Sequence, residues 1–272
     1  MRVLLASEPG SADRPNEDFA AAVPGAAVLL DGAGFPSAWK TGCVHGTAWY
    51  ARTLGGLLAA GASDNTVPLP EVLGRGIEQV RAMHAGTCDL RNPATPQATV
   101  IMARRAREML EYLVLCDSVL LLQVGNGPAR PVTDHRLDTI ASRLRAECGV
   151  TAETRRDDPA RRASSERIEA ARNQPGGFWL AAADPAAASQ AITGTEPVAD
   201  LAAAALLSDG VTRLADRYHL ATWDQLTAIL ADEGPTGLIR RVRKAESTDP
   251  HGARWPRGKI CDDATAVWWP AD

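Results

Sequence analysis

Acidic side chains recur in this sequence where short apolar runs begin or end. Asp31 follows AAVLL, Asp209 follows AAALLS, and each is itself followed by glycine. The other such clusters are Glu17 with Asp18, before FAAAV, and Asp262 with Asp263, before ATAVWW. Carboxylates that gather in one cleft repel one another unless a cation neutralises them, and Mg²⁺ and Mn²⁺ prefer oxygen ligands. The pattern therefore predicts a divalent-metal site, although each motif taken alone is also ordinary turn or loop chemistry.

The elements that must position these residues are indicated by the apolar patterns. Short apolar or alternating runs that end at Gly, Pro, Asp or Asn predict strands within 2–7, 18–32, 98–105, 108–125 and 264–269. Apolar positions at three-to-four spacing predict helices over 37–61, 70–88 and 222–233. The segment 108–125 is typical of adjacent antiparallel strands. Because alternate strand ends of an antiparallel sheet share one edge, the acidic clusters could converge there.

Bulk composition limits the classes of protein to consider. The chain has 272 residues, 45% of them hydrophobic, and we expect a single domain over 1–272. A charged, arginine-rich stretch at about 137–180 interrupts the apolar patterns and is predicted to be a helical insertion. The formal net charge of −4 gives no general attraction to nucleic acid or to an anionic membrane. Without an apolar run long enough for a signal peptide or a membrane span, we expect a soluble cytoplasmic protein.

The cysteines and histidines show no obvious site. The five cysteines are scattered and odd in number, and they lack the paired spacing of a zinc site or redox motif. We therefore expect them to be small core residues in a reducing cytosol. The histidines show no ligand spacing, and His45 and His84 fall in helical patterns where packing or surface roles are expected.

The order of the motifs carries more information than any one of them. The series NED, LLDGAG, LVLCDS, LLSDGVT and DDATAVWW resembles the type 2C metal-dependent serine/threonine protein phosphatases of the bacterial type, the PPM family. The resemblance covers about residues 3–269. It implies an α+β fold, an αββα sandwich in which two antiparallel β-sheets pack face to face with helices on both outer sides. It also implies a site for two Mn²⁺ or Mg²⁺ ions in the cleft at one sheet edge.

The resemblance implies roles for particular residues. Asp31 would bridge both metals, Gly32 would offer its carbonyl oxygen, Asp209 and Asp262 would complete the second metal's ligands, and Glu17 and Asp18 would hold metal-bound waters. The first aspartate of DDAT matches the family ligand, which favours Asp262 over Asp263. Asp117 in CDS matches the aspartate of the family's GDS motif, near a possible third metal, and Cys116 replaces the glycine.

The chain departs from the family pattern at three places. The phosphate-binding arginine commonly stands five residues before the aspartate of NED, but here Asp13 holds that place and Arg14 is one residue closer. Ala33 replaces the histidine of DGHGG, a proposed acid for the leaving group. Arg213 stands where an aspartate usually supports a third metal, so the third metal is not expected.

The activity implied is hydrolysis of phosphoserine and phosphothreonine monoesters by direct attack of a metal-bridging hydroxide, with Arg14, Asp31 and Asp209 as catalytic residues. Arg254, Arg257 and Lys259 in RWPRGK could form a substrate rim or an ordinary solvated loop. Two alternatives stay open beside a phosphorylated protein substrate. The chain could be a catalytically weak regulatory member of the fold, or a phosphatase of small phosphorylated metabolites.

Overall fold

The computed structural model describes residues 3–34, 41–151, 154–155 and 157–270. Two five-stranded antiparallel sheets form the centre of the fold. One has the order β1 (Leu4–Glu8), β12 (Ala264–Pro270), β11 (Leu201–Leu207), β8 (Val119–Val124), β9 (Arg130–Val132). The other has the order β10 (Ile192–Pro197), β7 (Met109–Leu115), β6 (Val100–Ala106), β3 (Ala26–Leu30), β2 (Phe19–Val23). A short pair, β4 (Gly32–Ala33) with β5 (Gln97–Ala98), lies near the end of β3.

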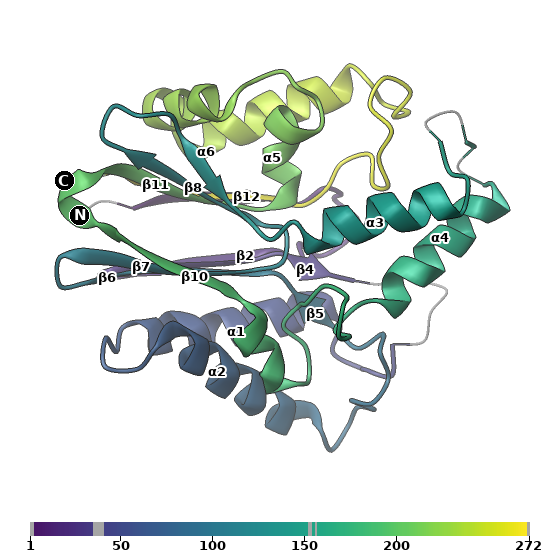
Figure 1. Cartoon of the computed structure of the whole chain (residues 1–272), viewed down its shortest axis with the longest axis horizontal. Helices are drawn as coiled ribbons and strands as arrows, with labels where there is room; N and C mark the ends of the chain where they lie inside the picture. The colour runs from purple at the N-terminus through teal and green to yellow at the C-terminus, as the bar shows by residue number, and fades with distance from the viewer. Residues whose placement is uncertain (1–2, 35–40, 152–153, 156, 271–272) are drawn as a thin grey trace.

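Helices cover both outer faces of this pair of sheets (Figure 1). α1 (Thr47–Ala62) and α2 (Leu69–His84) pack against the sheet that contains β3 and β6, and their apolar side chains share one core cluster with it. α5 (Asp209–Asp216) and α6 (Trp223–Ser247) pack against the other sheet. The inner faces of the two sheets form a third apolar core. Because every sheet face is covered by apolar contacts, the layers are those of an αββα sandwich.

The arginine-rich stretch forms α3 (Arg136–Glu147) and α4 (Pro159–Ala170), which pack against each other. These helices lie at the end of the sandwich where β4 is found, away from the two chain termini (Figure 1). Two 3₁₀ segments, η1 (Pro185–Gln190) and η2 (Val198–Asp200), flank β10. Among the described residues, no helix is long and apolar enough to cross a membrane.

The structure confirms the predicted strands and changes the helix limits. The helix predicted over 37–61 begins only at Thr47, and its predicted part at 37–40 lies outside the described residues. The helix predicted over 70–88 ends at His84. The helix predicted over 222–233 continues to Ser247 through a bend at Gly234, where φ is 70° and Pro235 follows. From the sequence, the pair Gly234–Pro235 predicts the end of a helix. In the structure a second helical segment follows this pair, because α6 packs against β1 and β12.

Candidate metal centre

Acidic residues from four separate elements meet at one edge of the sandwich. Asp31 follows β3, Asp18 precedes β2, Asp209 begins α5 and Asp262 precedes β12. The backbone N–H of Asp209 lies 3.5 Å from Oδ2 of Asp31, although the two residues are 178 positions apart. The convergence predicted for the acidic clusters is therefore present in the structure.

Glycine allows two of these segments to approach closely. A Cβ on Gly32 would lie 2.6 Å from the carbonyl oxygen of Glu17 and 2.7 Å from Cγ2 of Thr47, the first residue of α1. A Cβ on Gly210 would lie 1.9 Å from the carbonyl oxygen of Asp263. Real Cβ atoms do not make contacts that short. Both DG motifs therefore need glycine, because any side chain would collide with the neighbouring backbone segment of the site.

The gathered carboxylates disfavour one another's ionised forms. Burial, and then the charges of Asp18 and Asp209, raise the pKa of Asp31 well above its ordinary value. Burial raises the pKa of Asp18 to about 7, and burial together with the nearby Asp209 raises that of Asp117 to about 6. Burial raises the pKa of Glu17, against the opposing charge of Lys259. A cation bound among these carboxylates would offset their repulsion and favour their ionised forms.

Asp18 gives the clearest indication that a cation fits here. Its side chain is buried, with 6% of the residue exposed, and neither carboxylate oxygen has a hydrogen-bond partner within 3.5 Å among the described residues. The nearby hydroxyl groups of Thr265 and Ser208 lower the pKa of this carboxyl, but by less than burial raises it. Its backbone N–H is held by Oδ1 of Asn16 at 2.9 Å, which fixes the start of β2. Buried carboxylates are normally paired, hydrogen-bonded or bound to metal, so the residues present fit a divalent cation with oxygen ligands.

The two aspartates of DDAT have different environments. Asp262 Oδ2 lies 2.5 Å from Nη2 of Arg213, and its Oδ1 lies 2.6 Å from Nζ of Lys259. Asp263 instead accepts hydrogen bonds from the backbone N–H groups of Gly10 and Glu17, both at 2.8 Å. Asp263 therefore ties the N-terminal loop to the start of β12, whereas Asp262 carries its charge within the acidic cluster.

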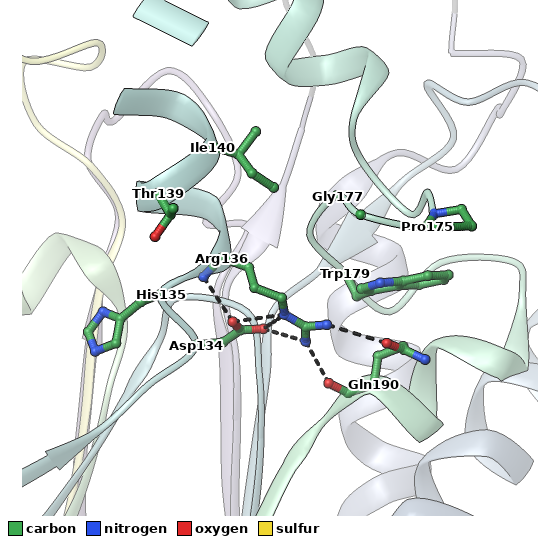
Figure 2. Close-up of a pocket in the computed structure, with 10 residues that line it drawn as sticks. Asp134, His135, Arg136, Thr139, Ile140, Pro175, Gly177, Trp179 and Gln190 are labelled. Carbon is green, nitrogen blue, oxygen red and sulfur yellow. Dashed lines mark hydrogen bonds and ion pairs between the residues drawn. The ribbon is translucent and has the colours of Figure 1, made fainter. Parts of the chain in front are cut away.

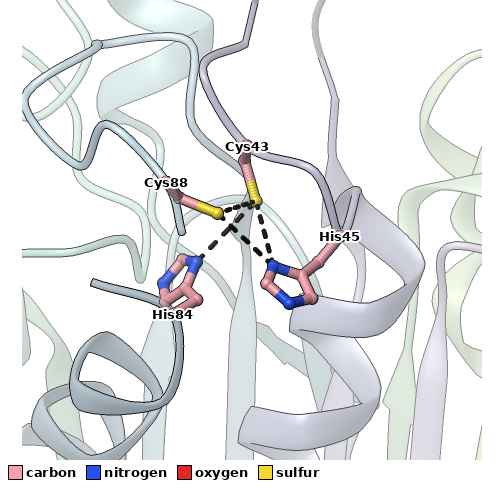
Figure 3. A group of neighbouring side chains, drawn as sticks. All are labelled: Cys43, His45, His84 and Cys88. Carbon is pink, nitrogen blue, oxygen red and sulfur yellow. Dashed lines mark hydrogen bonds between the residues drawn. The ribbon is translucent and has the colours of Figure 1, made fainter. Parts of the chain in front are cut away.

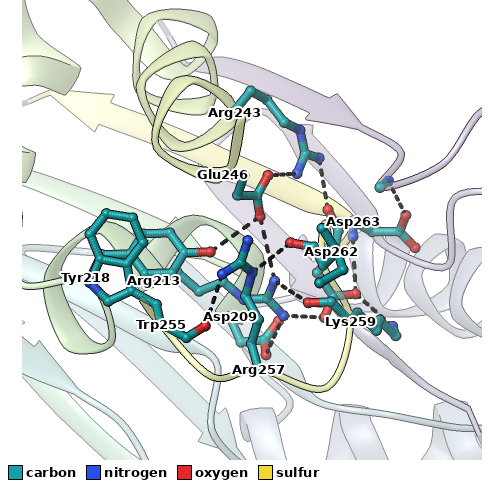
Figure 4. A network of polar contacts seen from close by, with 12 residues as sticks. Asp209, Arg213, Tyr218, Arg243, Glu246, Trp255, Arg257, Lys259, Asp262 and Asp263 are labelled. Carbon is teal, nitrogen blue, oxygen red and sulfur yellow. Dashed lines mark hydrogen bonds and ion pairs between the residues drawn. The ribbon is translucent and has the colours of Figure 1, made fainter. Parts of the chain in front are cut away.

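Arg213 lies at the centre of a buried charge network (Figure 4). Only 3% of this residue is exposed, and besides Asp262 it approaches Oε1 of Glu246 at 3.5 Å and Oδ2 of Asp209 at 3.9 Å. Arg243 Nη1 binds the other oxygen of Glu246 at 2.8 Å. The sequence indicated only that Arg213 replaces a family aspartate; the structure shows that its guanidinium supplies positive charge directly beside two of the proposed metal ligands.

Arg14 lies beside the cluster, in an exposed loop. It lines a small cleft of about 70 Å³ together with Glu17, Lys259 and Asp262. Its charge lowers the pKa of Glu17, although burial and other neighbours contribute more. The structure therefore places Arg14 next to the acidic residues despite its shifted spacing in the sequence.

The three positively charged residues considered for a substrate rim, Arg254, Arg257 and Lys259, have different environments. Lys259 lies in the cleft and binds Asp262, as described above. Arg257 is buried, and its guanidinium contacts Asp249 Oδ2 at 2.6 Å and the carbonyl oxygen of Ile260 at 2.8 Å. Arg254 lies over the ring of Trp255, 4.3 Å from its centroid. The expectation of a rim role for Arg257 is wrong because this side chain holds its own loop together.

Asp117 follows a residue with unusual backbone geometry. Cys116 has a φ of 70°, in the left-handed region that favours glycine. The position at which Cys116 replaces the glycine of GDS therefore keeps the conformation that glycine would provide, with a non-glycine residue in it. This turn places Asp117 close enough to Asp209 for their charges to interact.

A larger hollow of about 860 Å³ lies beside the start of α3 and contains no such cluster (Figure 2). Arg136 crosses its floor, where it binds Asp134 Oδ2 at 2.6 Å and the carbonyl oxygen of Gln190 at 2.6 Å. Trp179 forms part of the wall. The one carboxylate that lines this hollow, Asp134, is thus neutralised by its neighbour.

Solved structures with this architecture include serine/threonine phosphatases. Stp1 from Staphylococcus aureus superposes with a TM-score of 0.62 at 13% identity, over 99% of this chain and 94% of that chain. The catalytic domain of PstP, in complex with two manganese ions, gives 0.55 at 17% identity, over 99% and 97%. The PPM Ser-Thr phosphatase MsPP from Mycobacterium smegmatis, in complex with cacodylate, gives 0.59 at 15%, over 100% and 99%. The chain has the PPM phosphatase fold.

No family model matches the sequence, and no curated protein matches it. The PPM fold is therefore shared without extensive sequence similarity. It confirms the αββα sandwich and the resemblance that the order of the acidic motifs carried.

The expectation that the cysteines are core residues is wrong at four of the five positions, because only Cys116 is buried and Cys43, Cys88, Cys148 and Cys261 are half-buried. Two of the half-buried cysteines, Cys43 and Cys88, meet His45 and His84 outside the acidic cluster. A signal for this arrangement was present as two short Cys/His pairs about forty residues apart, each at one end of a helical pattern. The signal is weak in the sequence because α1 and α2 lie between the two pairs, and only their packing brings the pairs together.

Proposed function

We propose that this chain is a divalent-metal-dependent phosphatase that hydrolyses phosphoserine and phosphothreonine monoesters. The observation that carries the proposal is the buried Asp18 carboxylate without hydrogen-bond partners, within a cluster of carboxylates in the PPM fold. A manganese-bound relative with this fold supports Mn²⁺ as the first cation to test.

The metal-holding roles that we propose are those implied by the resemblance to the PPM phosphatases, and the meeting of these residues in one cluster supports them. Asp31, Gly32, Asp209 and Asp262 would provide oxygen ligands, while Glu17 and Asp18 would hold water molecules of the metals. When bound, the cations would supply positive charge to the phosphate oxygens and lower the pKa of a water molecule to the range where it is a useful nucleophile. The resemblance would give Asp117 a role at a third ion, but Arg213 provides positive charge beside Asp209 and Asp262 instead. We therefore propose two metals.

The remaining groups would act on the phosphate itself. Arg14 is exposed beside the cleft, and its planar guanidinium can donate two parallel hydrogen bonds to phosphate oxygens. Lys259, which lines the same cleft and binds Oδ1 of Asp262, adds positive charge. With Ala33 in place of a histidine, no imidazole is supplied by this motif, and protonation of the leaving alkoxide falls to water in the open cleft.

Metal titration and turnover test the proposal together. Protein stripped with EDTA should bind Mn²⁺ in calorimetry and regain p-nitrophenyl phosphate hydrolysis in proportion to occupancy. Full activity after exhaustive chelation would contradict the proposal. Once turnover is established, comparing phosphopeptides with small phosphorylated metabolites at equal concentration identifies the substrate class.

A second candidate is a regulatory protein with weak turnover. Specific support comes from Asp262, whose two oxygens bind Arg213 and Lys259 and are therefore partly neutralised without metal. In that case the chain would bind phosphorylated ligands with little hydrolysis. Wild-type protein that binds Mn²⁺ and inorganic phosphate but turns over neither phosphopeptides nor p-nitrophenyl phosphate would establish this second candidate.

A further inference from the structure

Two cysteines and two histidines meet at the end of the α1–α2 layer (Figure 3). One ligand-type atom from each of Cys43, His45, His84 and Cys88 lies within 4.8 Å of all the others. Cys43 Sγ lies 3.8 Å from Nδ1 of His45 and 3.7 Å from Nδ1 of His84. Cys88 Sγ lies 3.4 Å from both Cys43 Sγ and Nδ1 of His45.

The backbone holds these residues in place from both sides. Cys43 and His45 lie just before α1, while His84 is the last residue of α2. The N–H of Cys88 donates to the carbonyl oxygen of His84 at 3.0 Å, which turns the chain back over the helix end. The N–H of Asp89 donates to the carbonyl oxygen of Gly42 at 2.9 Å and joins the two segments. The cluster therefore results from two anchored turns.

The ring positions are also fixed. His84 is buried, and the ring of Trp49 stacks on that of His45 at 4.2 Å between centroids. Trp49 lies 5.2 Å from His84 as well. Burial lowers the pKa of His84, which favours the neutral imidazole that metals bind. Both histidines thus direct Nδ1 toward the two sulfurs with little freedom to turn away.

Four of the six distances among the ligand atoms fit a tetrahedral metal site, and the other two are no longer than 4.8 Å. Zn–S bonds of about 2.3 Å and Zn–N bonds of about 2.0–2.1 Å place neighbouring ligand atoms about 3.3–3.8 Å apart at tetrahedral angles. The four short distances in the cluster, 3.4–3.8 Å, fall in that range. The two sulfurs are farther apart than the about 2.05 Å of a disulfide bond.

The donor atoms select a different metal from the acidic cluster. Thiolate and imidazole suit Zn²⁺, whereas carboxylate and carbonyl oxygens suit Mg²⁺ and Mn²⁺. Four protein ligands would also fill a tetrahedral shell and leave no position for substrate or reactive water, as in structural zinc sites.

We propose that Cys43, His45, His84 and Cys88 bind one structural Zn²⁺ ion that fastens the start of α1 to the end of α2. The consequence reaches the acidic cleft through Thr47, the first residue of α1, whose side chain packs against Gly32 and Gly34. Zinc at this position would hold Thr47 against the segment that carries Asp31. The evidence for this site does not rest on the proposed phosphatase activity, because none of its ligands belongs to the acidic cluster.

Metal content and spectroscopy of the full chain test this inference. Protein purified without chelator should contain one zinc per chain by mass spectrometry of the metals, in addition to any Mn²⁺. Replacing zinc by Co²⁺ should produce thiolate-to-cobalt charge-transfer absorption and the intense visible bands of tetrahedral Co²⁺. Wild-type protein whose cobalt form lacks the thiolate band would overturn the proposal, whatever the variants do.

Variants separate this site from the acidic one. Because loss of an outer hydrogen-bond partner alone costs about 10–100-fold in metal affinity, Cys88→Ser and Cys43→Ser should each weaken zinc at least about 100-fold. The melting temperature of each variant should fall and no longer respond to a zinc chelator. Cys148→Ser, at another half-buried cysteine, is the matched control and should retain zinc and the cobalt spectrum. Zinc retained by both cluster variants, or a Cys43–Cys88 disulfide in zinc-free protein purified under reducing conditions, would refute the assignment.

Discussion

Replacing Asp18 by asparagine should stabilise the metal-free protein at neutral and alkaline pH while weakening its binding of divalent cations. The Asp18 carboxyl is buried without hydrogen-bond partners, and burial raises its pKa from 3.8 to about 7. The difference is about three pH units, and at about 1.36 kcal/mol for each it corresponds to at most about 4 kcal/mol of folding free energy. This is the cost of keeping the charge buried with no cation beside it.

The sign of the pH dependence follows from which state holds the proton more tightly. The pKa of Asp18 is higher in the folded state than in the unfolded chain. Below about pH 4 the carboxyl is protonated in both states and does not lower the stability. As the pH rises through about 7 the folded protein must bury the charge, and stability is lost. Metal-free wild-type protein should therefore lose stability between about pH 4 and about pH 7, and Asp18→Asn should not show this part of the loss. Mn²⁺ should stabilise wild-type protein more at the higher pH, because fewer protons compete with it.

Thermal unfolding in EDTA and in Mn²⁺ across this pH range measures the effect. At roughly 2 °C per kcal/mol for a domain of this size, Asp18→Asn should melt up to about 8 °C above wild type near pH 8 without metal. The difference should shrink or reverse in saturating Mn²⁺. Asp13→Asn is the control, because Asp13 is exposed in the same loop. If Asp18→Asn melted below wild type at pH 8 in EDTA, the interpretation of an uncompensated buried charge would be wrong.

Four further outcomes are expected. Asp31→Asn and Asp209→Asn should each lower kcat by at least about 10²-fold in saturating Mn²⁺, as expected for lost electrostatic stabilisation, and steady-state turnover near wild type would contradict their role. Asp263→Asn should cost little activity but about 1–3 kcal/mol of unfolding free energy in urea melts, because one of two backbone N–H groups loses its acceptor. Arg14→Ala should weaken inhibition by inorganic phosphate with Mn²⁺ affinity unchanged in calorimetry, and equal phosphate inhibition would remove Arg14 from the site. Arg257→Ala should destabilise the protein by about 3–5 kcal/mol in urea melts, since its buried ion pair would be broken, and a change within experimental error would refute the clamp.

The secondary structure was largely predictable where one face of an element is apolar. The apolar patterns of 18–32 and 108–125 predict strands, and β3, β7 and β8 lie there because alternating or continuous apolar side chains fill the sheet interiors. β10 was not predicted, because this edge strand of sequence ITGTEP is mostly exposed and carries little apolar pattern. The start of α1 was misplaced by ten residues because the apolar spacing continued through the turn before it.

The candidate site, too, was predictable from the sequence in part only. The acidic clusters were visible in sequence because each stands at the end of a strand with its own local pattern, and their order carried the family resemblance. The sequence did not show that Arg213 and Lys259 both bind Asp262, since these contacts cross between α5 and the loop before β12. It also placed Arg257 at the cleft, whereas the fold of its own loop buries it against Asp249.

By itself, the sequence determined the elements, the acidic residues at their ends and the resemblance to the PPM phosphatases, because these depend on neighbours along the chain. Only the tertiary structure decided which charges face one another and that Cys43 and His45 meet His84 and Cys88. The physical reason is that contacts between distant segments depend on how helices and sheets pack and on where each chain turn directs a side chain. Local spacing does not record those directions, and the α1–α2 hairpin brings two ordinary Cys/His pairs together in one cluster.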